Sequence, residues 1–379
     1  MDFIVFSDDW GMHPSSCQHI FRHIALKHRV LWVNTIGMRS PRLSLMDLKK
    51  VFTKAMNWMR FSHASYDDAE VQVIAPFMLP WHHIRWIYVF NTMMLRWRIH
   101  REQEKLKLLD TILVVTVPHL ADLFSSIKKK KYVYYRVDDF SSWPGLKHEF
   151  IKKEEEKILS EVDSVIASSK PLSTDIMAQC SAVDILEHGV DIDHFSMSGK
   201  DVEKPEYMEN MGRPIIGFYG LIDERIDQDL LKELALLRTH WSFLLMGEVQ
   251  TDISILRKCE NVYIPGRLKY DDLPVWTRYC DVCIIPYKNN KSTSTITPLK
   301  LYEYLAMGKG VVSTPLPAVE PIKYMISVTG DPVSFICAIE TFISDGDWHV
   351  KDRINYARER SWDKVADMFI QKINATIKV

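Results

Sequence analysis

Short runs of apolar residues alternate with segments of helical periodicity along most of the chain. In the first half the apolar runs lie at 3–6, 29–34, 71–76, 111–116, 131–137 and 164–169. The second half repeats the rhythm, with apolar runs at 214–220, 241–247, 261–266, 281–287, 310–314 and 325–330. Strands that are apolar throughout are typical of parallel sheets covered by helices on both faces. The pattern therefore predicts an α/β protein with two Rossmann-like sheets.

A polar stretch between the two sets of strands predicts where the domains divide. Residues 196–214, "SMSGKDVEKPEYMENMGRP", show no apolar periodicity, as expected of a linker. We therefore expect an N-terminal domain over 1–195, a linker over 196–212 and a C-terminal domain over 213–360. The last segment, 361–379, has the spacing of an amphipathic helix.

Composition narrows the class of protein only moderately. The chain has 379 residues, a net charge of −1 and 47% hydrophobic residues, which is typical of a globular protein and does not favour nucleic-acid binding. Six cysteines are scattered, and the C-x-x-C at Cys280 and Cys283 has no second pair, so we expect reduced thiols in a cytoplasmic protein. Neither a signal peptide nor a membrane-spanning run is evident, so a soluble protein or one bound to a membrane surface is expected.

The expected binding site lies where the strands end. Parallel sheets bind ligands at the carboxyl ends of their strands, so two such sheets predict a site in a cleft between them. Gly217 and Gly220 bracket the end of the first strand of the second set, and a helix follows. Glycine there lets backbone amides approach a phosphate, and Arg225 could add a charge. A plain strand–turn–helix connection is the alternative.

The segment "TPLKLYEYLAMGKGVVSTPLP" carries the most specific chemistry. Pro298 is expected in the first turn of a helix, and Lys300 lies in that turn, where a cation is unfavourable unless an anion is bound. Glu303 projects from the same face, and a carboxylate can accept both hydroxyls of a ribose. We therefore predict that Lys300 holds a diphosphate and Glu303 a ribose, with the hydroxyls of Thr295 and Thr297 nearby. A surface ion pair is the alternative.

These residues carry a family resemblance. "PLKLYEYLAMGKGVVST" resembles the donor-binding segment of the GT-B glycosyltransferases, particularly glycosyltransferase family 4, and "GFYGLIDERIDQDLL", "FLLMGE" and "LEHGVDIDHF" resemble neighbouring parts of that fold. The resemblance implies two Rossmann-like domains facing a cleft, a donor ribose held at Glu303, no bound metal, and a closing helix, "SWDKVADMF", that packs back on the N-terminal domain. The family's E-x7-E pattern has its first glutamate where this chain has Thr295, so the sugar and the stereochemistry stay open.

Two N-terminal segments, "FSDDWGMHPSSCQHIFRHIA" and "YYRVDDFSSWPG", resemble a bacterial subgroup that builds surface polysaccharides, such as the teichuronic-acid-type transferases. This implies a hexosyltransferase-type enzyme that moves a sugar to a glycan or lipid-linked acceptor. No cofactor is expected beyond a nucleoside-diphosphate sugar as co-substrate, with a UDP-sugar favoured and GDP- and dTDP-sugars as alternatives. Two other functions stay open: a nucleotide-sugar 2-epimerase of the same fold, and a non-catalytic nucleotide-sugar-binding protein.

The acceptor side is expected in the N-terminal domain. An inverting transfer needs a base to take the proton of the acceptor hydroxyl. Asp138 and Asp139 follow one strand and are the first candidates, and His119 follows another and is the second. Asp9 and His13 follow the first strand and are expected near the acceptor. The alternative for each carboxylate is a helix or turn cap.

Three segments suggest contact with an anionic membrane. Residues 44–61 form a basic amphipathic pattern, 81–101 are rich in tryptophan and arginine, and 128–131 are four lysines. Such segments suit an anionic membrane surface, which would place the protein at the inner face of the cytoplasmic membrane. Ordinary core-facing helices with arginines that extend to water are the alternative.

Overall fold

The computed structural model describes residues 1–11, 15–35, 71–76, 78–79, 81–143, 146–180, 183–196, 203–291, 293–344 and 349–375. The chain divides into two compact units. Unit N comprises Met1–Glu187 together with Trp362–Val379, and unit C comprises His188–Ser361. The sequence analysis placed the end of the N-terminal domain at residue 195. In the structure Val190 forms a parallel bridge with Ser361, which ties the start of unit C to its end.

Unit N is built on a seven-stranded, fully parallel sheet in the order β3-β2-β1-β4-β5-β6-β7. Its strands are β1 (Asp2–Ser7), β2 (Arg29–Asn34), β3 (Val71–Ile74), β4 (Thr111–Val115), β5 (Lys131–Arg136), β6 (Ser164–Ala167) and β7 (Val183–Ile185). The apolar runs predicted the first six. They did not predict β7, a three-residue edge strand whose residues are partly exposed.

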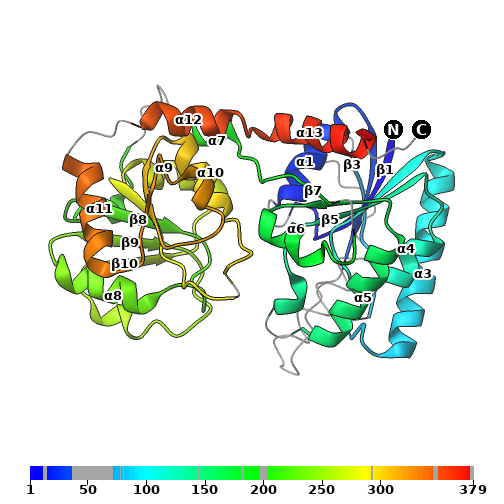
Figure 1. Ribbon diagram of the computed structural model, residues 1–379, viewed down its shortest axis with the longest axis horizontal. Coiled ribbons are helices and arrows are strands. Elements are labelled where there is room, and N and C mark those ends of the chain that lie inside the picture. The colour runs from blue at the N-terminus through cyan, green and yellow to red at the C-terminus, as the bar shows by residue number, and fades with distance from the viewer. Residues whose placement is uncertain are drawn as a thin grey trace. The chain divides into compact units, whose positions relative to one another are not determined.

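Helices cover both faces of this sheet, as Figure 1 shows. The helices are α1 (Ser16–Ala25), α3 (Arg85–Lys105), α4 (Ala121–Ser126), α5 (His148–Glu161), α6 (Lys170–Ile176) and α13 (Trp362–Ala375). On one face Phe369 of α13 packs edge-on against Phe21 of α1 and Tyr135 of β5. On the other face α3, α4 and α5 share one apolar core with the strands. The closing helix, α13, is therefore part of unit N.

Unit C contains a six-stranded parallel sheet in the order β10-β9-β8-β11-β12-β13. Its strands are β8 (Ile215–Tyr219), β9 (Ser242–Met246), β10 (Val262–Gly266), β11 (Val282–Ile285), β12 (Gly310–Ser313) and β13 (Ser327–Val328). All six coincide with predicted apolar runs. Most of them are fully buried, which is why they read as continuous apolar stretches rather than alternating ones.

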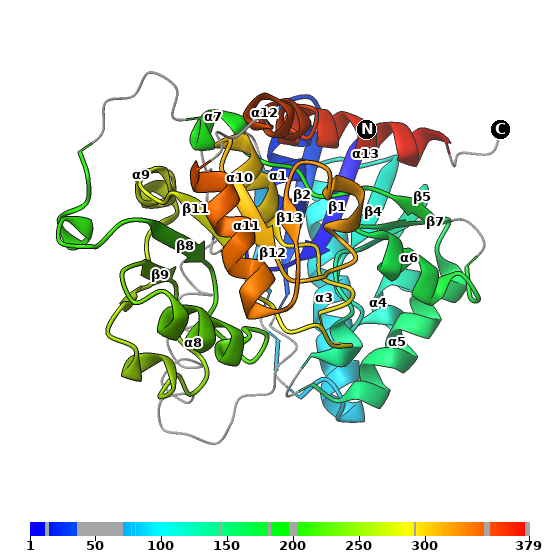
Figure 2. The same ribbon diagram turned by 60° about the vertical axis from the view of Figure 1, so that its left-hand side comes forward.

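The helices of unit C are α7 (Ile192–Phe195), α8 (Gln228–Leu237), α9 (Leu273–Arg278), α10 (Leu299–Ala306), α11 (Pro332–Ser344) and α12 (Val350–Arg358). The helices α8 and α11 pack together, and α10 packs on α12 (Figures 1 and 2). The buried Arg353 of α12 donates to the carbonyl oxygens of Gly308 (3.0 Å) and Met325 (2.9 Å). This side chain thereby ties the turn after α10 to the segment before β13.

Short 3₁₀ turns complete the chain: η1 (Phe140–Ser142), η2 (Glu206–Met208), η3 (Leu256–Lys258), η4 (Tyr270–Asp272) and η5 (Glu320–Ile322). The η2 turn lies in the segment that the polar composition marked as a linker. Met208 and Met211 of that segment are buried in the core of unit C. Two apolar anchors within a polar stretch thus attach residues 203–214 to unit C, and residues 197–202 lie outside the described part.

Each sheet has one point where the strand order reverses direction. In unit N this point lies between β1 and β4, and in unit C it lies between β8 and β11. The connections from the two central strands leave toward opposite sides there, and in open α/β sheets ligands bind at the carboxyl ends of the strands at such a point. Residues just after β1 and β4, and just after β8 and β11, are therefore the ones to examine.

Candidate functional site

Two glycines bring the ends of β8 and β9 into direct backbone contact. Gly220 follows β8 with φ +129°, and its amide donates to the carbonyl of Met246 at 2.9 Å. A Cβ atom on Gly247 would lie 1.8 Å from the carbonyl oxygen of Gly220. A side chain on Gly247 would therefore force the backbone to move, and the φ of Gly220 is one that residues with a side chain rarely adopt. The two strand ends are thereby kept as bare backbone.

Lys300 places its ammonium group directly over Gly220. A Cβ atom on Gly220 would lie 2.4 Å from Lys300 Nζ, so the glycine leaves the space that the lysine fills. The Nζ donates to the hydroxyl of Tyr287 at 2.7 Å. It also lies 4.3 Å from the ring centroid of Phe218 and 5.0 Å from that of Tyr287, within the range of cation–π attraction. A positive charge is therefore held at the point where the strand order reverses.

Helix α10 adds its N-terminus to this charge. The helix begins at Leu299, and Pro298 is the preceding cap residue, with extended backbone (ψ 118°). The sequence analysis had placed Pro298 one position later, inside the first turn. No side chain in the described part of the chain caps this end. The first amides and the helix dipole therefore supply positive potential beside Lys300.

Glu303 lies one turn further along α10 and accepts a hydrogen bond from the Tyr219 hydroxyl at 2.6 Å. Burial raises the pKa of Glu303 to about 7, although Tyr219 and Lys300 lower it, and Asp191 raises it further. The carboxyl group therefore holds its proton to a higher pH than an ordinary glutamate does. Lys300 donates to Tyr287, and Glu303 accepts from Tyr219. Each side chain is thus held by its own tyrosine, which differs from the simple surface ion pair that was the alternative.

Three aromatic residues that sequence reasoning missed build this site. Tyr219 donates its amide to the Tyr304 hydroxyl at 3.1 Å and packs edge-on against that ring, which fixes the phenol that holds Glu303. Phe218 and Tyr287 hold Lys300. The available signal was the aromatic pair in "GFYG", directly before the glycine, and the tyrosine that ends "DVCIIPY".

Arg225 approaches the same place, with its charge already paired. Its guanidinium contacts Asp223 at 2.7 Å (Nη2 to Oδ2) and lies 5.8 Å from the ring centroid of Tyr287. The loop is held to the end of β11, since Lys288 donates its amide to the Arg225 carbonyl at 2.8 Å. Arg225 and Lys300 thus both lie near Tyr287. Asp223, however, offsets much of the charge of Arg225.

The threonines before α10 divide into a structural one and two partly exposed ones. Thr293 is fully buried, and its hydroxyl donates to the carbonyl oxygens of Lys288 and Asn290. It folds the loop between β11 and α10, a role that the sequence did not indicate. The predicted Thr295 and Thr297 are partly exposed on the same loop, beside the N-terminus of α10.

The first candidates for a base, Asp138 and Asp139, follow β5 and are both engaged locally. Asp138 accepts from the Asp139 amide at 2.8 Å and from Trp143 Nε1 at 3.0 Å. Asp139 caps η1, since its Oδ1 accepts from the amide (3.1 Å) and hydroxyl (2.6 Å) of Ser141. Both carboxylates are partly exposed. Asp139 has the capping role that was the alternative, and Asp138 is bonded within the same turn. Capping leaves some of their oxygen lone pairs for a further donor.

His119, the second candidate base, is buried at the end of β4. Its ring lies 4.6 Å from that of His82, and both ring nitrogens lack a partner among the described residues. Burial keeps the pKa of His119 well below its usual value, with a smaller contribution from His82. The imidazole is therefore neutral, and only 1% of the residue is exposed to solvent.

The acceptor-side candidates follow β1. Asp9 is partly exposed, and its carbonyl accepts from Gln18 Nε2 at 3.2 Å. His13 lies outside the described residues. The neighbouring Asp8 is the centre of a cluster: its carboxylate accepts from the hydroxyls of Ser7 (2.8 Å) and Ser15 (3.0 Å) and from Gln18 Nε2 (2.8 Å). Burial raises the pKa of Asp8 despite these hydrogen bonds.

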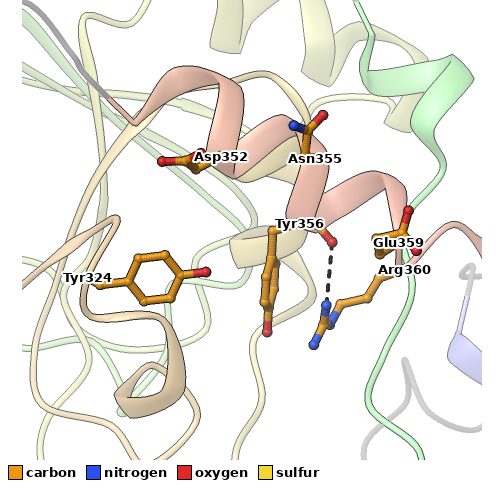
Figure 3. A pocket seen from close by; sticks show the side chains of 6 residues that line it. All are labelled: Tyr324, Asp352, Asn355, Tyr356, Glu359 and Arg360. Carbon is orange, nitrogen blue, oxygen red and sulfur yellow. Dashed lines mark hydrogen bonds between the residues drawn. The ribbon is translucent and has the colours of Figure 1, made fainter.

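A separate pocket of about 410 Å³ opens beside α12 in unit C (Figure 3). It is lined by Tyr324, Asp352, Asn355, Tyr356, Glu359 and Arg360. The Arg360 guanidinium lies 3.6 Å from the ring centroid of Tyr356 and covers one of its faces. No residue predicted to bind the donor lines this pocket. Within the described ranges there is also no group of three or more histidine, cysteine, aspartate or glutamate side chains that could hold a metal ion.

The chain has two α/β units, each built on a parallel sheet, and in unit C a lysine and the N-terminus of α10 lie where the strand order reverses. This architecture is the GT-B fold of glycosyltransferases. Sucrose-phosphate synthase from Thermosynechococcus elongatus has a similar fold, with a TM-score of 0.70, 12% identity, and coverage of 99% of this chain and 98% of that one. Anabaena Alr3699/HepE in complex with UDP has a TM-score of 0.67 at 13% identity, with 99% and 100% covered.

The similarity to a known family lies in unit C, where residues 213–345 match the family model "Glycosyl transferases group 1". A curated relative is the "Putative teichuronic acid biosynthesis glycosyltransferase TuaH" of Bacillus subtilis (strain 168), 32% identical over 264 residues. That match spans 64% of this chain and 66% of the relative. The predicted resemblance to a bacterial surface-polysaccharide subgroup agrees with it, and the comparisons do not favour the 2-epimerase.

Proposed function

We propose that the protein is a glycosyltransferase that moves a sugar from a nucleoside-diphosphate sugar to a glycan or lipid-linked acceptor in surface polysaccharide synthesis. One observation carries the proposal: a lysine and a glutamate on one helix, each held by its own tyrosine, at the strand reversal of a group 1 domain. The ammonium of Lys300 and the amides at the start of α10 would hold the diphosphate. Glu303 would accept the ribose hydroxyls.

The donor is proposed to be a UDP-sugar. The Anabaena protein of similar fold has been solved in complex with UDP and with UDP-glucose, and the trehalose-6-phosphate protein from E. coli with UDP-2-fluoro glucose. GDP- and dTDP-sugars are the alternatives. Thr295 and Thr297 would contact the transferred sugar, because they lie on the loop that enters α10. The reaction is proposed to need no cofactor and no metal.

Catalysis would rest on stabilising the leaving diphosphate. Negative charge grows on the phosphate oxygens as the glycosidic bond breaks, and fixed positive groups stabilise it without reorganising. Lys300 is the principal such group, and Arg225 would contribute less because Asp223 pairs with it. Among the candidate bases, Asp138 and Asp139 suit the role better than His119, since they are partly exposed and the imidazole is buried. Asp9 and His13 would lie on the acceptor side.

The site of action is proposed to be the cytoplasm, with peripheral contact at the inner face of the cytoplasmic membrane. A lipid-linked acceptor would be met there. In the part of the chain that is described, no helix is both long and apolar enough to cross a bilayer.

The experiment that tests the function is a transfer assay with separate donor and acceptor controls. The purified protein is incubated with UDP-glucose, UDP-galactose, UDP-N-acetylglucosamine or UDP-glucuronate, with and without extracted bacterial lipid-linked saccharides. Mass spectrometry reads the transfer products, and proton NMR distinguishes donor epimers, which have the same mass. We expect an acceptor whose mass grows by one sugar and the release of UDP. Isomerisation of the donor without acceptor would identify an epimerase. Donor binding without either product would favour a non-catalytic binding protein.

A further inference from the structure

Helix α3 exposes a continuous apolar stripe. Trp86, Met93 and Trp97 are 66%, 66% and 57% exposed, and Val89, Phe90 and Met94 are exposed beside them. Their spacing of three and four residues places all six on one side of the helix. We call these six residues the outer face of α3. The turn before the helix adds two more exposed apolar side chains, Trp81 and Ile84.

The opposite side of α3 already has its partners. Leu95 and Ile99 lie in the core of unit N, and Tyr88 donates its hydroxyl to Glu154 of α5 at 2.7 Å. Asn91 donates to the carbonyl of Leu79 at 2.8 Å. The helix is therefore apolar on two sides, and only one side is buried. A surface helix of a soluble protein needs a single apolar stripe, so the outer face is not explained by folding of the unit.

Basic residues border the outer face. Arg85 and Arg96 lie along one edge and Arg101 along the other, and the Arg101 guanidinium lies 5.7 Å from the ring centroid of Trp97. Across the helix five basic residues, Arg85, Arg96, Arg98, Arg101 and Lys105, outnumber Glu102 and Glu104. Glu102 is buried and pairs with Arg98 at 3.3 Å. The border of the stripe is thus positively charged.

We infer that the outer face of α3 docks on the surface of an anionic phospholipid bilayer. Tryptophan favours the boundary between headgroups and acyl chains, and arginine binds anionic headgroups while its stem stays apolar. The helix would lie flat on the bilayer, because its other side is held in the core of unit N. Figure 1 shows α3 in the layer that also contains α4 and α5. This inference deepens the proposed function, since it names the surface that would meet a lipid-linked acceptor.

Of the other segments predicted to contact a membrane, the run of lysines at 128–131 is partly engaged within unit N. In the run of lysines at 128–131, Lys129 donates to the Phe124 carbonyl at 2.7 Å, and Lys131 is buried in β5 and bonded to the Ile373 carbonyl. These two lysines serve unit N and do not form a free basic patch. Residues 44–61 lie outside the described part. The docking surface therefore rests on α3 alone.

The test is co-sedimentation of the full chain with vesicles of phosphatidylcholine containing 0, about 20 or about 40% phosphatidylglycerol. Neither donor nor acceptor is present. We expect binding that rises with the anionic fraction and weakens in high salt. Trp86→Ser/Met93→Ser/Trp97→Ser should lower the partition coefficient about tenfold or more. Arg85→Gln/Arg96→Gln/Arg101→Gln should remove most of the dependence on phosphatidylglycerol.

Matched controls use exposed residues elsewhere. Leu236→Ser/Leu237→Ser on α8 and Arg257→Gln/Lys258→Gln on η3 should bind vesicles as the wild type does. The inference is wrong if wild type does not bind anionic vesicles, or if the α3 variants bind equally well. It is also wrong if light scattering shows a dimer that the tryptophan variant dissociates, because the face is then a protein interface. UDP binding by the same preparations reports separately on the donor site.

Discussion

The strand reversals of units N and C have the same topology but opposite chemistry. In unit C the ends of β8 and β9 are bare backbone at Gly220 and Gly247, with one cation above them. In unit N the corresponding place is filled by side chains: Thr116 donates to Ser7, and Ser7 donates to Asp8, at 2.8 Å each. The first arrangement holds a positive charge over bare backbone, whereas in the second the polar side chains bond one another. We therefore expect unit C to bind the charged part of the donor.

The largest expected effect comes from placing a side chain between the ends of β8 and β9 in unit C. Gly247→Ala places a Cβ atom 1.8 Å from the Gly220 carbonyl oxygen, so both strand ends must move. We expect a loss of about 3 kcal/mol or more in the free energy of unfolding of unit C. A urea titration of each protein measures it. Gly330→Ala is the control, since its Cβ would meet only ordinary contacts at 3.5 Å or more. Equal stability of the two variants would contradict the close contact.

The next largest effect is expected in the stability of unit N, without a change in UDP binding by unit C. Asp8→Ala removes the acceptor of three side-chain donors, Ser7, Ser15 and Gln18, and leaves them unsatisfied in a partly buried place. We expect unit N to lose about 2–3 kcal/mol of stability, with UDP affinity unchanged. Urea titration and calorimetry on one preparation measure both. A weaker UDP affinity at full stability would mean that this cluster is a ligand site and that the contrast between the units is false.

Lys300→Ala should weaken UDP binding by about ten- to fiftyfold, since a charge-assisted contact to phosphate is lost. Lys300→Met is the matched variant, because it keeps an apolar stem between Phe218 and Tyr287 without the charge. Uridine, which has no phosphate, should bind both variants as it binds the wild type. A loss that is equal for uridine and UDP would assign Lys300 a purely structural role.

The smallest expected effect on stability is a pH dependence. The pKa of Glu303 in the folded protein is about 7, above its ordinary value of 4.5, so the unfolded chain releases this proton first. Stability should therefore fall as the pH rises from about 4.5 to about 7 and then level off. The difference between wild type and Glu303→Gln should change by about 1–2 kcal/mol between pH 5 and 7, because Gln does not ionise. A difference that is independent of pH would mean an ordinary, solvated carboxyl group.

A substitution in unit N tests the proposed base. Asp138→Asn and Asp139→Asn, made separately, keep a side-chain oxygen that can still accept from Asp139 and Ser141. Folding and UDP binding should be nearly unchanged, while transfer should fall about 100-fold or more in the variant that lacks the base. Turnover at the wild-type rate in both variants would remove these residues from the chemistry.

Much of the fold follows from local patterns in the sequence. Buried parallel strands such as β4 and β8 read directly as apolar runs, because no face of the strand meets water. The short edge strand β7 has no such run, since its residues are partly exposed. The buried positions of Met208 and Met211 gave no signal for a similar reason, because two apolar residues in a polar stretch are too few to create a period.

The candidate site was only partly predictable. Lys300, Glu303 and Gly220 stood out because a charge or a glycine at a helix or strand terminus needs a reason. Tyr219 and Tyr287 did not, since a buried aromatic residue at the end of a strand is ordinary until its hydroxyl is seen to bond a carboxylate or an amine. Asp223 precedes Arg225 by two positions in the sequence, but only the structure shows that their side chains form an ion pair.

The most direct test of the account is calorimetric titration of UDP into wild type, Glu303→Ala and a control, Glu233→Ala, which replaces an exposed glutamate on α8. The account predicts that wild type and control bind UDP alike and that Glu303→Ala binds it at least about tenfold more weakly, because the acceptor of the ribose hydroxyls is gone. Equal affinity of all three proteins for UDP, or no binding by the wild type, would contradict a donor site at the start of α10.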